Sequence, residues 1–311
     1  MYHLFVVLVV SLYSVTGLAV DKNLTYQNPD QKPDASEIAQ QVYFVNHHYA
    51  FANLESAGKK TEQLAIYHFT DKLTKPSRVF ARRYLSHDLS SEGVKSRDLV
   101  HFTSGKQRGV GILVTDFQKQ GRPMGVSIWL PALRKVRTFT EPEHHEIWGG
   151  SILTYGDIYL RRPDDEVHEL IAIKQMDECA VSVEYEDETF FKKNRIPSED
   201  CTNKGKTVYL LKSLHKQKNW WYEYRLRWID KKHYTDYRTE YFKDGKRVKL
   251  MTKSWYPLDK SDPRATLWHY WYVRDEQSQQ QSLVVLPRES IKFNTDRKER
   301  FWSEATLRKL R

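Results

Sequence analysis

The sequence predicts a mainly β protein with a helix near each end, built on a single antiparallel sheet. Short runs in which apolar and polar residues alternate recur between clusters of Gly, Pro, Ser and Asp, as half-buried strands do. No run of helical length interrupts these strands, which favours antiparallel pairing over βαβ units. Aromatic residues make up 13% of the chain, a composition that suits strands. We expect roughly ten or eleven strands, and no repeat or linker divides residues 20–311, so we expect one domain.

The first nineteen residues are predicted to be a secretory signal peptide. They hold no Lys, Arg, Asp or Glu, and residues 4–12 are almost entirely apolar. This run is shorter than the roughly 20 residues that span a bilayer. The small residues before Val20 favour cleavage near Ala19. No later apolar stretch is long enough to cross a membrane, so we expect an exported, periplasmic protein that does not span a membrane after cleavage.

One long helix is predicted after the extended residues 20–33. Asp34 and Glu37 have the spacing of a capping box, with Asp34 as the N-cap residue. The apolar residues that follow at helical spacing form one stripe, which favours a helix packed against the sheet; they are Ile38, Val42, Val45 and Tyr49.

Strands are predicted from residue 64 onwards, first at residues 64–69, 78–85, 98–103 and 109–117. In the next run Val126, Ile128 and Leu130 fall on one face and Ser127 on the other, and Pro131 ends the strand or marks an edge because proline cannot donate to a sheet. Further strands are predicted at residues 134–140 and 152–160, on either side of the break at residues 141–151.

The clearest predicted strand spans residues 220–228. Aromatic and apolar residues alternate there with Glu223, Arg225 and Arg227, so we predict an aromatic inner face and a charged outer face. The pair Asp244-Gly245 predicts a hairpin between residues 234–243 and 247–255. Two more strands are expected at residues 265–273 and 282–293, the second with a bulge or edge at Pro287, before a short basic helix at residues 298–310.

The two cysteines, Cys179 and Cys201, are predicted to form a disulfide. Exported proteins fold in oxidising compartments, and the number of cysteines is even. The bond would hold the charged segment between them in place.

The sequence gives little support for a metal site, for a catalytic nucleophile or for nucleic-acid binding. His144-His145-Glu146 and His47-His48 lack the spacing of a zinc site, and we expect no metal and no cofactor. No Gly-x-Ser-x-Gly motif is present. The formal net charge of +10 is spread along the chain, and aromatic and basic residues at 220–228 should face opposite ways, which argues against a nucleic-acid platform.

Residues 129–157 resemble the outer-membrane lipoprotein-sorting proteins related to LolA. The resemblance lies in Trp129-Leu130-Pro131, in Lys135-Val136-Arg137, in Gly150-Ser151 and in Thr154-Tyr155-Gly156-Asp157, and it extends to residues 109–113 and 301–308. Ile152 and Gly156 stand where the family has acidic residues. The resemblance implies a LolA- and LppX-like sheet, curved into an incomplete, half-open barrel whose apolar concave face lies under a helical lid and holds acyl chains.

The resulting functional prediction is a periplasmic carrier, not an enzyme, that moves the acyl chains of a lipoprotein or lipid towards the outer membrane. By resemblance, an inner-membrane transporter of the RND type is a possible partner. The alternatives are a binding module for another amphipathic ligand, such as a phospholipid or glycolipid, and, third, an exported hydrolase. Candidate ligand-binding residues are Trp129, Trp148, Trp220, Tyr222, Tyr224, Leu226 and Trp228.

The break at residues 141–151 allows two interpretations. Ile147-Trp148 followed by Gly149-Gly150 suits a mobile flap over a lipid cavity, with apolar side chains and a flexible backbone. The same residues also suit a plain connection in which Trp148 plugs one end of the core.

Overall fold

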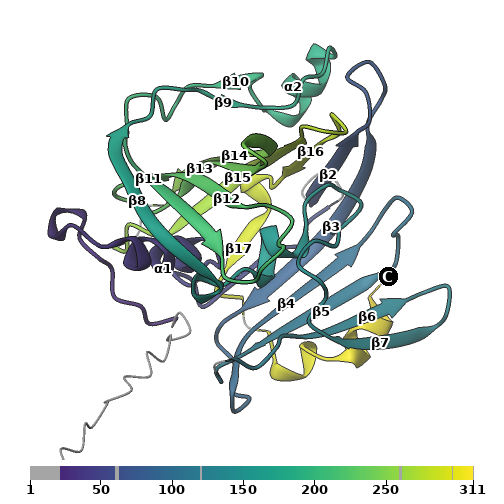
Figure 1. The fold of residues 1–311 in the computed structure, drawn as a ribbon. Coiled ribbons are helices and arrows are strands. Elements are labelled where there is room, and N and C mark those ends of the chain that lie inside the picture. The colour runs from purple at the N-terminus through teal and green to yellow at the C-terminus, as the bar shows by residue number, and fades with distance from the viewer. Residues whose placement is uncertain (1–21, 60–62, 120, 259–260, 296, 311) are drawn as a thin grey trace, which may run out of the picture.

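The computed structural model describes residues 22–59, 63–119, 121–258, 261–295 and 297–310 (Figure 1). The predicted signal peptide, residues 1–19, lies outside this range. Within the described range, no helix has the length and apolar character needed to span a bilayer.

The long helix forms where its capping residues predict it. Helix α1 (Ala35–Asn46) begins after Asp34, whose side chain accepts a hydrogen bond from the Glu37 backbone at 2.8 Å. The Glu37 side chain in turn accepts from the Asp34 backbone, also at 2.8 Å, which completes the capping box. The predicted apolar stripe is buried, although Tyr49 lies beyond the end of the helix.

A single large antiparallel sheet dominates the described residues. Its order is β7-β6-β5-β4-β3-β2-β16-β15-β14-β13-β12-β11-β8, and β1 pairs with β3 and β17 beside this path. The bounds of these strands are β1 (Asn53–Ser56), β2 (Leu64–Phe69), β3 (Ser77–Ser86), β4 (Val94–Phe102), β5 (Gly111–Phe117), β6 (Gly125–Leu130), β7 (Lys135–Thr140), β8 (Glu166–Gln175), β11 (Thr207–His215), β12 (Tyr224–Asp230), β13 (Asp236–Lys243), β14 (Lys246–Pro257), β15 (Thr266–Asp275), β16 (Gln281–Val285) and β17 (Ile291–Phe293). The sheet is not closed into a barrel, because its end strands β7 and β8 do not pair with each other.

The two ends of the open sheet are consecutive in the sequence. Residues 141–165, which we call the crossing segment, connect β7 to β8 and run between the two sides of the curved sheet (Figure 1). The segment contains the short helices η3 (Gly156–Leu160) and η4 (Pro163–Asp165). It lies where an incomplete barrel needs a cover.

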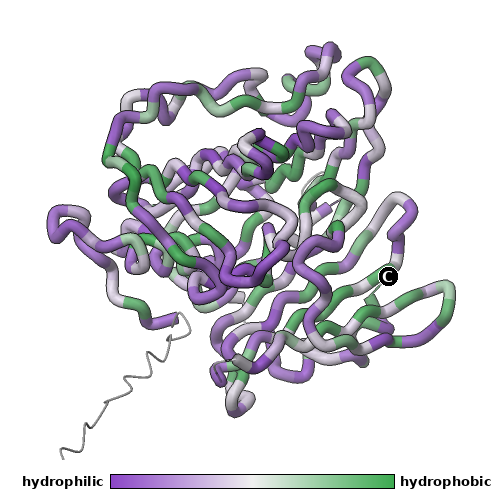
Figure 2. Tube along the Cα trace, viewed as in Figure 1, coloured by the Kyte–Doolittle hydropathy of each residue, from purple (hydrophilic) through white to green (hydrophobic). Residues whose placement is uncertain are grey.

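The sheet is buried on one face and on parts of the other. We call the face that packs against α1 and the crossing segment the inner face; its core includes Val42, Trp148 and Trp271. On the outer face, helix α3 (Glu304–Lys309) covers β5 and β6. The residues around helix α2 (Glu188–Asn194), together with the two-stranded sheet of β9 (Ala180–Val181) and β10 (Glu199–Asp200), cover the outer face of β14–β16 and β2. In Figure 2, hydrophobic and hydrophilic residues accordingly alternate along many strands.

Several predicted elements are wrong in type or bounds. Residues 152–160 form a turn and the helix η3 instead of a strand. Residues 282–293 form two strands, β16 and β17, because Pro287 and the short helix η5 (Arg288–Ser290) separate them. The prediction missed β1, β8, β9, β10, β11 and α2, and the described residues contain more strands than the ten or eleven expected.

The hairpin prediction is confirmed, but the orientation predicted for residues 220–228 is wrong. Asp244 and Gly245 connect β13 to β14 with φ angles of 50° and 68°, as a two-residue hairpin turn requires. On β12, by contrast, Arg225 and Arg227 are buried on the inner face, at 8% and 4% exposure, whereas Leu226 is only half-buried on the outer face. The charged face of β12 is the inner one because other strands contribute carboxylates, one of which pairs with Arg225. The alternation along β12 by itself does not reveal those carboxylates.

Candidate functional site

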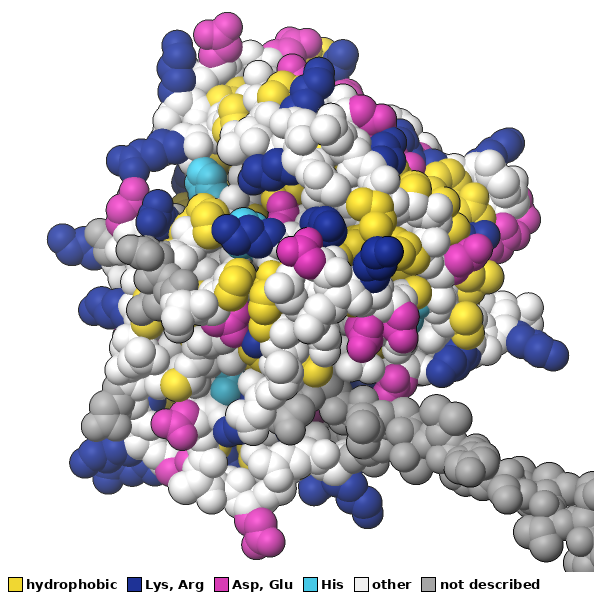
Figure 3. Space-filling view, turned by 90° about the vertical axis from the view of Figure 1, so that its left-hand side faces the viewer, with side chains coloured by type: hydrophobic (Ala, Val, Ile, Leu, Met, Phe, Trp, Pro, Cys, Tyr) yellow, Lys and Arg dark blue, Asp and Glu magenta, His cyan; other side chains and the backbone are white. Residues whose placement is uncertain are grey.

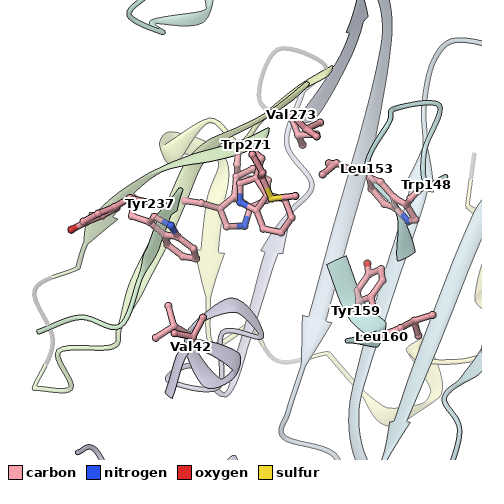
Figure 4. Packing of buried hydrophobic residues seen from close by; sticks show 14 of the residues in the cluster. Val42, Trp148, Leu153, Tyr159, Leu160, Tyr237, Trp271 and Val273 are labelled. Atoms are coloured by element: carbon pink, nitrogen blue, oxygen red, sulfur yellow. The ribbon is translucent and has the colours of Figure 1, made fainter. Parts of the chain in front are cut away.

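The inner face encloses an apolar cavity of about 30 Å³. Figure 4 shows Trp148, Leu153 and Tyr159 of the crossing segment on one side of the core, with Val42 of α1 and Trp271 on the other. The residues lining the cavity are Asn46, Leu64, Arg83, Val100, Trp148, Leu153, Ile158, Tyr159, Trp268, Trp271 and Val284. A cavity of this size has room for about two or three water molecules.

A tight turn places Trp148 in this core. Gly149 and Gly150 have φ angles of 63° and 73°, which residues other than glycine rarely adopt. The Trp148 backbone N–H donates to Leu153 at 2.8 Å, and the indole ring is 4% exposed. A Cβ atom on Gly149 would approach Ile66 to 2.9 Å. The two glycines thus permit a close turn, and Trp148 acts as a core plug in this conformation, whereas Ile147 is 65% exposed.

A second cavity of about 50 Å³ adjoins the first and is strongly charged. Both cavities are lined by Asn46, Ile158 and Tyr159. Asp157 of the crossing segment, whose side chain is fully buried, pairs with Lys249 at 2.5 Å and accepts a hydrogen bond from Tyr241 at 2.8 Å. Although burial alone raises the pKa of Asp157, Lys249 and Arg161 outweigh it and hold the pKa below its usual range. Asp157 therefore fastens the crossing segment to the sheet as a charged group.

Two further buried ion pairs border the charged cavity. Arg225 holds Glu166 through two hydrogen bonds of 2.9 and 2.5 Å, and the Tyr222 hydroxyl donates to Glu166 at 3.0 Å. Burial alone would raise the pKa of Glu166, but the positive charge of Arg225 outweighs this effect and keeps the pKa below its usual range. Lys253 pairs with Asp236 at 2.8 Å and also donates to Asn46 of α1 at 2.7 Å.

Arg227 shares its hydrogen-bond partner with a histidine. Its guanidinium donates to the Ser213 hydroxyl at 3.2 Å, and the His168 Nδ1 atom lies 2.8 Å from the same oxygen. The other ring nitrogen of His168 lies 2.9 Å from the Pro163 carbonyl, so a neutral ring donates to that carbonyl and accepts from Ser213. Burial lowers the pKa of His168 to about 4. Ser213 is fully buried, and its contacts fit a structural hydrogen-bond network better than an accessible nucleophile.

The histidines weighed as metal ligands do not converge. His48 is buried and His47 partly so, and the His47 Nδ1 atom already bonds the Tyr43 carbonyl at 2.9 Å. His144 lies 3.4 Å from Glu141, whereas His145 and Glu146 are exposed. Among the described residues, the group with metal-ligating spacing is Cys179, Glu199 and Cys201, but its two thiols are bonded to each other.

The predicted disulfide between Cys179 and Cys201 is confirmed, with an S–S distance of 1.98 Å. It closes the segment that carries α2 over the outer face of the sheet.

The predicted ligand-binding residues do not form one surface. Trp148 lines the apolar cavity, and Tyr222 is buried beside the charged one. Trp220 stacks on His215 with ring centroids 3.7 Å apart, in an open polar depression that Tyr222 also lines. The others lie on the outer side of their strands: Trp129 beside α3, Tyr224 stacked on Phe242, and Leu226 and Trp228 beyond it on β12.

The prediction missed the charged residues of the interior. A signal existed for Asp157, because it ends the Thr154-Tyr155-Gly156-Asp157 motif. Arg225 and Arg227 were recognised but placed on the solvent side. Glu166 begins β8, a strand that the prediction missed.

Basic side chains do not gather on the surface that Figure 3 presents. Lys and Arg residues lie there among acidic ones. On this face, the arrangement agrees with the expectation that the +10 charge is spread along the chain.

Comparisons with known proteins agree with this architecture. A domain assigned to outer membrane lipoprotein sorting, from Vibrio parahaemolyticus, is 16% identical with a TM-score of 0.64, covering 90% of this chain and 100% of its own. A DUF1329 family protein from Desulfovibrio piger is 14% identical with a TM-score of 0.63, covering 88% and 100%. A LolA superfamily protein from Nitrosomonas europaea is 12% identical with a TM-score of 0.53, covering 88% and 99%.

These TM-scores establish similarity of fold, and the resemblance to LolA-like proteins is confirmed at that level. A comparison with curated proteins finds no match. A family model described as "Uncharacterized protein" matches residues 95–309, which is more than half of the chain. The chain therefore belongs to that family, and its fold is the LolA-like open antiparallel sheet.

Proposed function

We propose that this protein is an exported carrier, active in the periplasm, that binds acyl chains of a lipid or lipoprotein inside the curved sheet. The observation that carries the proposal is the apolar cavity between the inner face, α1 and the crossing segment, in a sheet of LolA-like fold. Each CH₂ group moved from water into such an interior gains about 0.8 kcal/mol. Non-covalent burial therefore suffices to hold an acyl chain.

Binding requires the interior to expand, since its two cavities measure about 30 and 50 Å³. The crossing segment is the element suited to move. It spans the unpaired ends β7 and β8, and its polar links to the sheet include those of Asp157 to Tyr241 and Lys249. We propose that its displacement opens the apolar cavity towards the gap between those strands.

The remaining parts of the proposal follow from the same carrier role. Residues 1–19 are the cleaved signal peptide and residues 20–311 the carrier domain. Trp148 belongs to the acyl-binding surface, since it lines the apolar cavity. Tyr222 stays in the proposed set at the charged end of the interior, while Trp129, Trp220, Tyr224, Leu226 and Trp228 await a test of binding. An inner-membrane transporter of the RND type is the proposed donor, and the outer membrane the destination.

Two neighbouring valines on β16 provide a matched test. Val284 lines the apolar cavity, whereas Val285 packs on the outer face, and both are 3% exposed. Val284→Phe and Val285→Phe should each destabilise the protein by about 1–3 kcal/mol through overpacking. Only Val284→Phe should reduce binding of a fluorescent fatty acid, measured by titration at a temperature where both variants are folded.

Native mass spectrometry of the purified protein provides the second measurement. A carrier should retain lipid through purification, and its ester-hydrolysis activity should equal that of buffer. Absence of both lipid and probe binding, or equal loss of binding in the two valine variants, contradicts the proposal. Turnover of an ester panel would instead favour an exported hydrolase.

A further inference from the structure

The charged cavity beside α1 carries more positive than negative charge. Its lining includes three carboxylates and four basic side chains; the carboxylates are Asp157, Glu166 and Asp236, and the basic side chains are Arg161, Arg225, Arg227 and Lys253. Lys249 adds a further positive charge, since it pairs with Asp157. Three carboxylates thus face five basic groups in a buried space.

The pairing of these groups leaves two arginines with unused donors. Glu166 is taken by Arg225, and Asp236 by Lys253. Arg227 makes its hydrogen bond to the neutral Ser213 hydroxyl, and among the described residues its Nε atom has no hydrogen-bond partner. Arg161 donates to Tyr241 at 3.1 Å and forms an ion pair with Asp157, whose carboxylate lies 3.5 Å from Nη2, while its Nε and Nη2 atoms have no hydrogen-bond partner within the same described set.

A buried guanidinium in this state is costly for the folded protein. Arg161 and Arg227 are 8% and 4% exposed, and a charge removed from water needs a counter-charge or hydrogen bonds to offset its lost hydration. Burial, followed by repulsion from Arg225, lowers the pKa of Arg227 to about 9. The surroundings thus oppose its charge, which an added anion would compensate.

Arg161 and Arg227 both line a space of suitable size. The cavity, at about 50 Å³, accommodates about four water-sized groups, which is the scale of a single phosphate or carboxylate. Guanidinium groups bind such oxyanions through paired, charge-assisted hydrogen bonds. The shared lining residues Asn46, Ile158 and Tyr159 place the apolar cavity directly beside it.

We propose that this cavity is an oxyanion site, in which Arg227 and Arg161 bind the phosphate or carboxylate group of an anionic amphiphile. The anion site itself stands apart from the carrier proposal. Its assignment to a lipid head group rests on that proposal, because the acyl chain would lie in the adjoining apolar cavity. The head group would be held at the charged end of the interior, with the chain directed towards Trp148 and Trp271.

The test uses three probes on the mature protein: inorganic phosphate, dodecyl phosphate and dodecyl maltoside. Affinity is measured by calorimetric titration, and unfolding temperature is followed at each probe concentration. The variant Arg227→Met removes the unpaired charge while retaining most of the side-chain length. Arg108→Met, at an exposed position, controls for non-specific effects of lost charge.

A second variant separates binding from folding. Arg225→Met should lower the unfolding temperature without any probe, because it leaves Glu166 buried and unpaired. Arg227→Met should unfold at a temperature equal to or above that of the unchanged protein, because it removes an uncompensated charge.

We expect dodecyl phosphate to bind the unchanged protein at least about tenfold more tightly than dodecyl maltoside, as for charge-assisted hydrogen bonds. Arg227→Met should abolish that difference, and Arg108→Met should preserve it. If phosphate and dodecyl phosphate bind Arg227→Met as tightly as the unchanged protein, the anion site is refuted, whatever happens with the neutral amphiphile. Binding of phosphate without either amphiphile supports the anion site and contradicts the carrier, whereas equal binding of both amphiphiles supports the carrier and contradicts the anion site.

Discussion

Replacing Trp148 with alanine distinguishes a core plug from a mobile flap. The indole is 4% exposed and lies in the inner core, with its ring centroid 6.0 Å from that of Phe102. Deleting a fully buried Trp side chain costs about 3–5 kcal/mol, because the transfer free energy is lost and a cavity remains. For a chain of this size, that loss lowers the unfolding temperature by roughly 5–8 °C.

The variant Trp148→Phe is the matched control. Among the described residues, the indole Nε1 atom of Trp148 has no hydrogen-bond partner, so phenylalanine removes a buried unsatisfied donor along with part of the ring. The gain from removing that donor offsets part of the packing loss. We therefore expect Trp148→Phe to lie within about 1.5 kcal/mol of the unchanged protein.

The assay is urea unfolding followed by intrinsic fluorescence, with fatty-acid probe binding measured on the same samples. A plug predicts a large loss of stability for Trp148→Ala and a small one for Trp148→Phe. If Trp148→Ala keeps its unfolding temperature within about one degree and alters probe uptake, the plug interpretation is wrong and the flap is correct. Unchanged stability together with unchanged binding would refute both.

Three further measurements follow from the structure. Reduction should expose two thiols, Cys179 and Cys201, to alkylation and lower stability by about 2–5 kcal/mol; labelling of both in the non-reduced protein contradicts the bond. Arg225→Asp should destabilise the protein by about 3–5 kcal/mol or more, since it removes the partner of a buried carboxylate, and Leu226→Asp should destabilise it by less. The opposite order of unfolding temperatures would show that Leu226, and not Arg225, faces the interior. Burial lowers the pKa of His87 to about 3, so between pH 6.5 and 3 the unfolded chain binds a proton that the folded protein excludes. His87 should therefore contribute a fall in stability of about 1.4 kcal/mol per pH unit on acidification through this range; His87→Gln should reduce the slope by that amount, and an unchanged slope would show that His87 does not contribute.

Local signals in the sequence determined much of the secondary structure. The capping box at Asp34 and Glu37 specifies the start of α1, because both partners lie within one helical turn. Asp244-Gly245 specifies the β13–β14 hairpin, because this turn needs two residues that tolerate positive φ. The LolA-like motifs identified the open sheet, and Cys179 and Cys201, the only cysteines, left one intramolecular pairing.

Other elements were decided by contacts between segments distant in the sequence. Alternation along β12 revealed two different faces, but Glu166 on β8 placed Arg225 inside, 59 positions away. Ile152–Leu160 has strand-like composition, yet it lies in the crossing segment, where Asp157 bonds Tyr241 and Lys249. A buried charge is tolerated only beside its partner, and the fold alone brings these partners together. The sequence thus determined which residues could form strands, while the tertiary structure decided which face of β12 became the charged interior.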